Sequence, residues 1–66
     1  MELTEAQIIQ QKLFDQARTS LDSDLRLVDT IAELFETSTD SAYRRIRLQK
    51  LMGLDEVIKV CAHFDL

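Results

Sequence analysis

Three arginines, Arg44, Arg45 and Arg47, lie within four consecutive positions of a chain whose formal net charge is −4. Each carries a permanently charged, planar guanidinium group that can donate two parallel hydrogen bonds to a phosphate or to the edge of a guanine base. Residues 41–53 hold four basic side chains and no acidic one, whereas the rest of the chain is acidic. Because salt screens charges beyond roughly 8 Å, this local patch can attract an anionic partner despite the negative net charge. A solvated face on an ordinary bundle helix is the alternative interpretation of the same cluster.

The other reactive side chains are too few for catalysis or metal binding. Cys61 and His63 are the only cysteine and histidine, and at two positions apart they do not share one face of a helix, so no pair of nucleophile and base is expected. A tetrahedral zinc site lacks ligands, and no glycine-rich phosphate loop is present. We therefore predict neither an enzyme nor a cofactor, a metal ion or a small-molecule substrate. Cys61 is expected to be a small buried hydrophobe, and His63 a partly exposed cation near a helix C-terminus.

The composition favours a small all-α domain. Sixty-six residues suffice for a single domain, which we place at residues 1–66, and 45% hydrophobic residues can form its core. One glycine and no proline are too few for the frequent turns of a β-rich domain. No apolar run approaches the roughly 20 residues of a membrane span, and no signal-peptide pattern is present, so a cytoplasmic protein is predicted.

Periodic apolar residues predict a compact bundle of four to five helices. The first begins with a capping box, for which Thr4 and Gln7 have the required separation, and Gln10 is the polar exception on its apolar face. Asp55 and Glu56 are expected to stabilise the start of the last helix by interacting with its dipole. The expected helices cover about residues 4–21, 25–36, 39–48 and 54–64. The last of them is expected to bury Leu54, Val57, Ile58, Cys61, Ala62 and Phe64.

The helices expected over residues 25–36 and 39–48 form a candidate helix-turn-helix, because only a short break separates them. Ser38 is a natural N-cap for the second helix, whereas Ala42 and Ile46, four positions apart, are its main contacts with the core. The opposite face of this helix is polar and basic. In the motif, such a helix lies in the major groove of double-stranded DNA with its outer face free to contact the bases. The predicted DNA-contacting residues are Ser38, Thr39, Asp40, Tyr43, Arg44, Arg47 and, in the following loop, Lys50.

These residue types match the groups that DNA presents. Arg44 and Arg47 could each bind a guanine edge or a phosphate, and Lys50 could bind a backbone phosphate. Tyr43 offers a hydroxyl group and a ring edge, although packing at the rim of the core is an equally good interpretation of this residue. Asp40 could accept a hydrogen bond from a cytosine amino group or weaken binding. The hydroxyl groups at the helix N-terminus could donate to phosphate oxygens.

The stretch "IAELFETSTDSAYRRIR" (31–47), followed by "LDEVIKVCAHF" (54–64), resembles the N-terminal domains of bacterial transcriptional regulators with a lambda-repressor-like (Cro/C1-type) helix-turn-helix. The resemblance covers about residues 25–66. It implies a compact helical domain that binds operator DNA, usually as a homodimer. It also implies that this domain is part of a longer regulator.

The resemblance assigns individual positions as well. It places Ala32 where the two motif helices touch, and it gives the predicted DNA-contacting residues their usual positions. The family commonly has glycine or asparagine where this chain has Glu36, and glycine where it has Leu48. At these two positions the chain departs from the family pattern.

A small protein-interaction or dimerisation module without direct DNA contact is the alternative function. The first helix is long, and it could pair with its copy in a dimer through Ile8, Lys12 and Gln16. Against this alternative, a single core is expected to use the apolar faces of all the helices. The two functions differ in whether the helix over residues 39–48 responds to duplex DNA.

Overall fold

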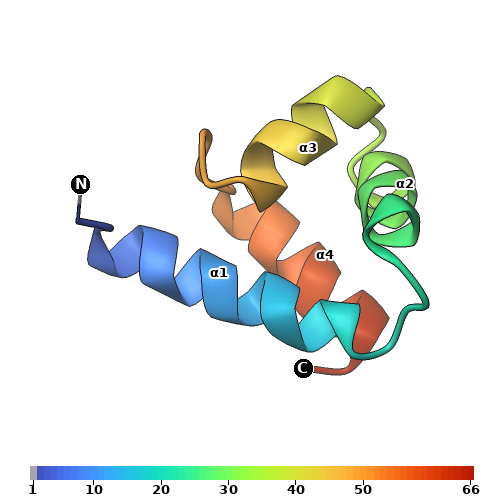
Figure 1. Cartoon of the computed structure of the whole chain (residues 1–66), viewed down its shortest axis with the longest axis horizontal. Coiled ribbons are helices and arrows are strands. Elements are labelled where there is room, and N and C mark those ends of the chain that lie inside the picture. Colours follow the sequence, from blue (N-terminus) through green and yellow to red (C-terminus); the bar gives the residue numbers. More distant parts are fainter. Residues whose placement is uncertain (1) are drawn as a thin grey trace.

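The computed structural model describes residues 2–66 as four α-helices joined by short turns, without a strand (Figure 1). Met1, the first residue of the predicted domain, lies outside these described residues. The all-α class is confirmed. The helices in this part of the chain number four rather than up to five, because residues 47–53 form turns and irregular backbone instead of a further helix. They are α1 (Glu5–Arg18), α2 (Asp24–Leu34), α3 (Thr39–Ile46) and α4 (Leu54–Phe64).

α1 begins at the predicted capping box. The backbone N–H of Gln7 donates to Thr4 Oγ1 at 3.2 Å, and the backbone N–H of Thr4 donates to Gln7 Oε1 at 2.8 Å. These bonds satisfy two of the amide groups that a helix start leaves without partners. The helix ends at Arg18, earlier than predicted, and there the Thr19 hydroxyl donates to the carbonyl of Gln16 at 2.6 Å. Neither this helix nor any other in the described part is long and apolar enough to cross a membrane.

The other three helices end with a residue in the left-handed conformation. These residues are Glu36, Leu48 and Asp65, with φ angles of 53°, 65° and 58°. In each case the N–H of the next residue donates to the carbonyl five positions earlier, at 2.8–2.9 Å, which closes the helix end. α2 and α3 therefore stop about two residues before their predicted ends. The chain thus forms left-handed turns at the two positions where the resemblance led us to expect glycine or asparagine.

Glu36→Gly is expected to raise the free energy of unfolding by about 0.5–1 kcal/mol. A residue with a Cβ atom is strained by roughly 1–2 kcal/mol in the left-handed conformation, and glycine removes that strain. Glycine also raises the conformational entropy of the unfolded chain, but this costs only about 0.4–1 kcal/mol, so the net effect is stabilising. Glu36 is exposed, so its side chain contributes little packing. Urea denaturation measures the change. Glu33→Gly, at an exposed position inside α2, is the control and should destabilise by about 1 kcal/mol. Destabilisation by both variants would contradict the prediction.

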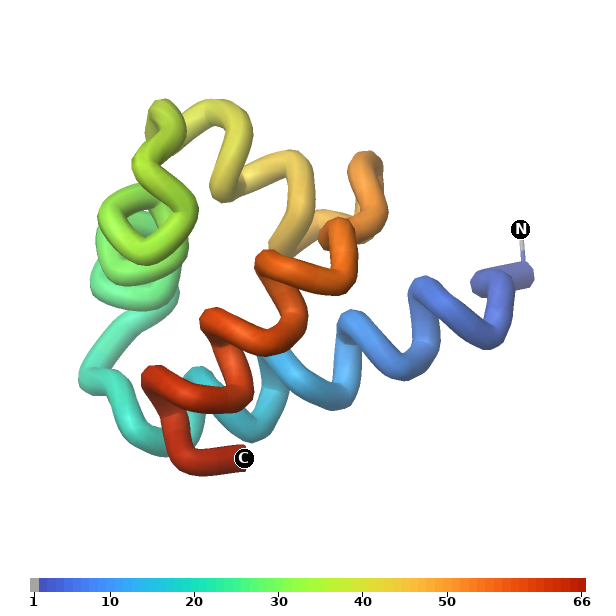
Figure 2. Tube along the Cα trace, turned by 180° about the vertical axis from the view of Figure 1, so that it is seen from behind, coloured from blue at the N-terminus to red at the C-terminus, as the bar shows by residue number. Residues whose placement is uncertain are grey.

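The core lies where the four helices meet. α2 and α3 pack against each other most extensively, and the fully buried Ala42 lets them approach closely. In Figure 1, α1 and α3 lie on opposite sides of the molecule with α4 between them, and Figure 2 shows the same arrangement from behind. The buried hydrophobic residues are Phe14, Ala17, Leu27, Ile31, Ala32, Ala42 and Val60.

α4 has the predicted bounds, but only part of its predicted face is buried: Val57, Cys61 and Phe64 are partly buried, and Phe64 packs against the core. Leu54 is 82% exposed and Ile58 is 64% exposed, whereas Val60, which was not expected in the core, is fully buried. Glu56, one turn before Val60, pairs with Arg45 of α3. The expectation that one core uses every apolar face is therefore wrong, and part of the apolar surface of α4 faces solvent.

Candidate nucleic-acid interface

α3 presents one face to the core and the other to solvent. Ala42 and Arg45 are buried on the inner side, and Ile46 packs against the core as a partly buried residue. The predicted contact residues Thr39, Asp40, Tyr43, Arg44 and Arg47 are all exposed, as are Ser38 at the N-cap and Lys50 in the following turn. The 3.6-residue period of a helix gathers the four α3 residues of this set and Arg47, the C-cap of the helix, on one outward face. We call these five residues the outer face of α3.

The outer face of α3 is ordered by two side-chain pairs, each spaced four residues apart. Arg44 Nη2 lies 3.3 Å from Asp40 Oδ2. Arg47 Nη1 donates to the Tyr43 hydroxyl at 3.1 Å, and its guanidinium carbon lies 5.5 Å from the centre of the tyrosine ring. Exposed pairs of this kind contribute about 0–1 kcal/mol, so both guanidinium groups can exchange these partners for a stronger anion. Tyr43 is 46% exposed, which leaves its ring accessible at the rim of the domain.

The start of α3 is capped as predicted. Ser38 Oγ accepts a hydrogen bond from the backbone N–H of Ser41 at 3.1 Å. The cap fixes the turn between α2 and α3 in an extended backbone conformation at Ser38. It therefore also fixes the angle at which α3 leaves α2.

A shallow groove of about 390 Å³ runs between the first half of α2 and the outer face of α3. Asp29 and Asp40 line it together with Leu25, which is 78% exposed. Carboxylates can accept hydrogen bonds from amino groups, and an exposed leucine can contact a methyl group. Leu25 was not among the predicted contact residues. Its position just before the apolar face of the second expected helix was the available signal.

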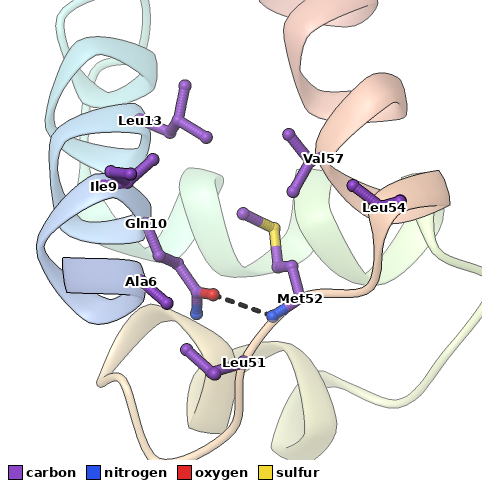
Figure 3. A pocket seen from close by; sticks show the side chains of 8 residues that line it. All are labelled: Ala6, Ile9, Gln10, Leu13, Leu51, Met52, Leu54 and Val57. Atoms are coloured by element: carbon purple, nitrogen blue, oxygen red, sulfur yellow. Dashed lines mark hydrogen bonds between the residues drawn. The ribbon is translucent and has the colours of Figure 1, made fainter. Parts of the chain in front are cut away.

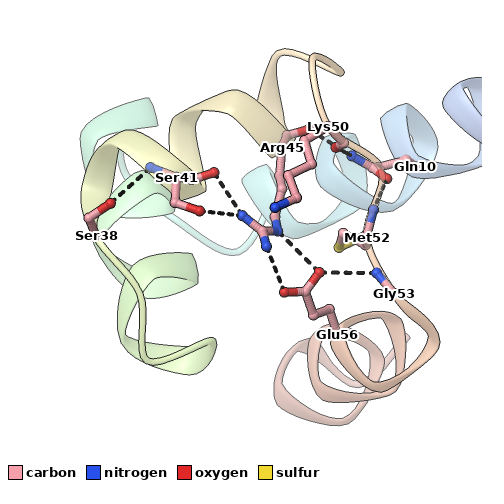
Figure 4. A network of polar contacts seen from close by, with 8 residues as sticks. All are labelled: Gln10, Ser38, Ser41, Arg45, Lys50, Met52, Gly53 and Glu56. Carbon is pink, nitrogen blue, oxygen red and sulfur yellow. Dashed lines mark hydrogen bonds and ion pairs between the residues drawn. The ribbon is translucent and has the colours of Figure 1, made fainter.

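Arg45 holds α3 against α4 from behind (Figure 4). Its Nε and Nη2 atoms donate to the two carboxylate oxygens of Glu56 at 3.1 and 2.9 Å. Its Nη1 donates to the backbone carbonyl of Ser41 at 3.0 Å and also to the Ser41 hydroxyl, and its guanidinium carbon lies 5.6 Å from the ring centre of Phe35. Arg45 is only 7% exposed. The arginine cluster thus divides into two outward side chains and one that fixes the helix.

The carboxylate of Glu56 stays ionised because of its partners. Burial raises its pKa, but hydrogen bonds from Arg45 and from the backbone N–H of Gly53, together with the charges of Arg45 and Lys50, lower the pKa below its ordinary value of 4.5. The bond from Gly53 is 3.0 Å long and caps the first turn of α4. Glu56 was predicted only as a charge near the helix dipole, and its pairing with Arg45 was missed.

Gln10 ties the segment after α3 to α1 (Figure 4). Its Nε2 donates to the backbone carbonyls of Arg45 at 2.8 Å and Lys50 at 3.0 Å, and its Oε1 accepts from the N–H of Met52 at 2.8 Å. The side chain is 4% exposed. The polar exception on the apolar face of α1 therefore holds the backbone that carries Lys50.

The remaining candidates for chemistry are dispersed. Cys61 is half-buried rather than buried. His63 is exposed near the end of α4, and its ring centre lies 4.8 Å from that of Phe64. Over residues 2–66, no three His, Cys, Asp or Glu side chains gather where they could hold a metal ion.

Comparisons with protein-family models, with curated proteins and with solved structures found no match to this chain. The resemblance to lambda-repressor-like domains stays a prediction. The function is therefore inferred from the geometry of α3 and of the residues that hold it.

Proposed function

We propose that this domain binds double-stranded DNA sequence-specifically, with α3 in the major groove and with α2 and α3 acting as a lambda-repressor-like helix-turn-helix. The observation that carries the proposal is the division of α3 into two faces. Tyr43, Arg44 and Arg47 are exposed together on the outside, whereas Ala42 and Arg45 fix the inside. A helix that must enter a groove needs this combination of a free polar face and a rigid attachment.

The dimensions and residue types of α3 suit the groove. Eight helical residues span roughly 12 Å, and the major groove is about 12 Å wide. In this proposal Arg44 leaves Asp40 and Arg47 leaves Tyr43 to bind guanine edges or phosphates. Lys50 and Ser38 lie beyond the two ends of α3, where they contact the backbone phosphates on either side of the groove.

The domain would act in transcription by occupying a site on DNA, without catalysing a reaction. As the DNA-binding part of a longer bacterial regulator in the cytoplasm, it would place that regulator on an operator. The acidic surface elsewhere repels DNA from the other faces of the domain, which favours docking through α3.

Arg44→Ala and Arg47→Ala are each expected to weaken binding to a cognate site by about 1–3 kcal/mol, or roughly 5- to 150-fold, if the contact is to a base. Fluorescence anisotropy with a labelled duplex measures the affinities. Lys12→Ala is the control, because it removes one positive charge from an exposed position on α1 rather than on α3. An equal loss on all duplexes would assign the contact to phosphate, and an unchanged affinity for both arginine variants would contradict the proposal.

A ¹⁵N-HSQC titration with a mixed-sequence duplex at low salt, repeated at higher salt, tests the proposal directly. Shifts confined to residues 38–50 that fade as salt rises are expected, because phosphate contacts release bound counterions. An unchanged spectrum at low salt would remove the DNA-binding function for this domain. The alternative function, a protein-interaction module without DNA contact, is favoured by the exposed apolar residues of α4 and predicts shifts that follow protein concentration instead.

A further inference from the structure

The Asp40–Arg44 pair places a hydrogen-bond acceptor beside a set of donors on the outer face of α3. Arg44 Nη2 lies 3.3 Å from Asp40 Oδ2, and the two side chains are 61% and 76% exposed. The residues are four positions apart, so one turn of the helix presents both groups on the same side. An ionised carboxylate only accepts hydrogen bonds, whereas a guanidinium group only donates them. The pair therefore has a fixed order of donors and acceptor along α3.

The surroundings of Asp40 restrict what it can face in a complex. Asp29, a second acidic residue, lines the same groove between α2 and α3. By contrast, the groove between α1 and α4 (Figure 3) is lined by apolar side chains and by Gln10, whose amide oxygen already accepts from the N–H of Met52. A phosphate oxygen close to Asp29 and Asp40 would be repelled by both. The DNA group that faces Asp40 must therefore be a donor, and in the major groove the donors are the amino groups of the bases.

A G·C base pair presents the pattern complementary to this pair of side chains. Its major-groove edge carries the N7 and O6 acceptors of guanine, followed by the amino group of cytosine. A Watson–Crick hydrogen bond joins O6 to that amino group, so the two lie about 2.9 Å apart. This spacing is close to the 3.3 Å that separates the guanidinium nitrogen of Arg44 from the carboxylate oxygen of Asp40. A single G·C pair can thus meet both side chains at once.

We propose that Asp40 and Arg44 together read one G·C base pair, with Arg44 on the guanine and Asp40 on the cytosine amino group. This inference rests on the proposed binding of α3 in the major groove. Each side chain exchanges its ionic partner for the base edge, so neither charge is left without a partner. If Arg44 moved to a phosphate instead, Asp40 would face the anionic DNA alone, and the cost of that repulsion favours base readout.

The order of the two side chains determines which base pairs are rejected. A C·G pair places the amino group against Arg44 and the guanine acceptors against Asp40, so both contacts become repulsive. A·T and T·A pairs offer one acceptor beside one donor, which gives Arg44 a single hydrogen bond rather than two. G·C is therefore the preferred pair, and inversion to C·G should weaken binding by roughly 5- to 150-fold.

Selection from a pool of random duplexes locates the pair. The wild-type chain, Arg44→Ala and Asp40→Ala are selected in parallel, and fluorescence anisotropy then measures the enriched duplexes. The wild-type chain should enrich G·C at one position, and both variants should lower the preference at that same position. Asp15→Ala is the matched control, because it removes an exposed carboxylate that pairs with an arginine on α1, and it should leave the selected sequence unchanged. Changes at different positions in Arg44→Ala and Asp40→Ala would overturn the proposal.

Methylation of the cytosine amino group tests the Asp40 contact alone. N4-methylcytosine still pairs with guanine through its remaining N–H, but it no longer offers a donor in the major groove. At the selected pair, this modification should weaken binding of the wild-type chain by about tenfold, within the range for one base contact. Binding of Asp40→Ala should not change, because that variant makes no bond to the amino group. An equal loss in both proteins, or no loss in either, overturns the proposal.

The base contact and DNA binding itself are tested separately. Asp40→Ala keeps Arg44, Arg47 and Lys50 and removes one negative charge, so it should bind mixed-sequence duplex at least as tightly as the wild-type chain. Duplex-induced shifts at residues 38–50 without a shared G·C position would overturn the base contact and leave DNA binding in place. A chain that binds no duplex would remove both. Circular dichroism of each variant confirms that the fold is retained.

Discussion

Gln10→Leu is expected to lower the free energy of unfolding by about 2–4 kcal/mol. The substitution keeps the side-chain volume but leaves the carbonyl of Lys50 and the N–H of Met52 without a partner, whereas the carbonyl of Arg45 keeps the N–H of Leu48 at 3.1 Å. Each buried polar group without a hydrogen bond costs about 1–3 kcal/mol, and movement of the 47–53 segment toward water recovers part of this. A domain of this size is stable by roughly 3–10 kcal/mol, so the loss is a large fraction of the total.

Urea denaturation followed by circular dichroism measures this effect, and the neighbouring position supplies the control. Gln11 is exposed on α1, so Gln11→Leu makes the same chemical change outside the core and should alter stability by less than about 0.5 kcal/mol. In hydrogen exchange, the amide of Met52 should lose its protection in Gln10→Leu and keep it in Gln11→Leu. Equal effects of the two substitutions would show that the hydrogen bonds of Gln10 do not hold the segment.

Arg45→Met is expected to lower the free energy of unfolding by about 2–4 kcal/mol. Methionine preserves much of the buried stem, but the bidentate contact with Glu56 and the bonds to Ser41 are lost. The Glu56 side chain is only 23% exposed, so its carboxylate stays partly desolvated without its main partner. Arg44→Met is the control, because Arg44 is exposed and makes only a surface pair, and the expected change is below about 0.5 kcal/mol.

The pH dependence separates the ion pair from simple packing. Because folding lowers the pKa of Glu56 below 4.5, its contribution to stability is complete above that pH and is lost as the pH falls through the folded-state pKa. The stability difference between the wild-type chain and Arg45→Met should therefore be largest near neutral pH and should narrow below pH 4.5. If this stability difference stays constant from neutral pH down to pH 2.5, roughly two units below the ordinary carboxyl pKa, lost packing rather than the ion pair explains it.

These two residues connect stability to the proposed function. Arg45 fixes the inner side of α3 and Gln10 fixes the segment that carries Lys50, so both determine where the outer face of α3 is presented. Variants at these positions should weaken DNA binding by lowering the folded population rather than by removing a contact. Lowering the temperature raises the folded population, so it should recover part of a loss caused by unfolding but none of a loss caused by a missing contact.

Local signals in the sequence were enough to locate the helices. The capping box at Thr4, the cap at Ser38 and the apolar periodicities predicted four elements whose starts agree with the structure within about a residue. The ends were harder to predict. Glu36 and Leu48 adopt left-handed conformations that glycine usually adopts, so neither residue type marked the end of its helix.

The sequence by itself determined the all-α class, the helix starts and the polar, arginine-bearing outer face of α3, because these depend on nearest neighbours along one helix. Only the tertiary structure decided what Arg45, Gln10 and α4 do. Arg45 is one of three similar arginines in sequence, and its partner Glu56 lies eleven residues away. α4 buries Val60 and pairs Glu56, one turn earlier, with Arg45 of α3, so both residues contribute to its orientation. Leu54 and Ile58 consequently face solvent, because contacts between helices rather than periodicity within one of them set the orientation.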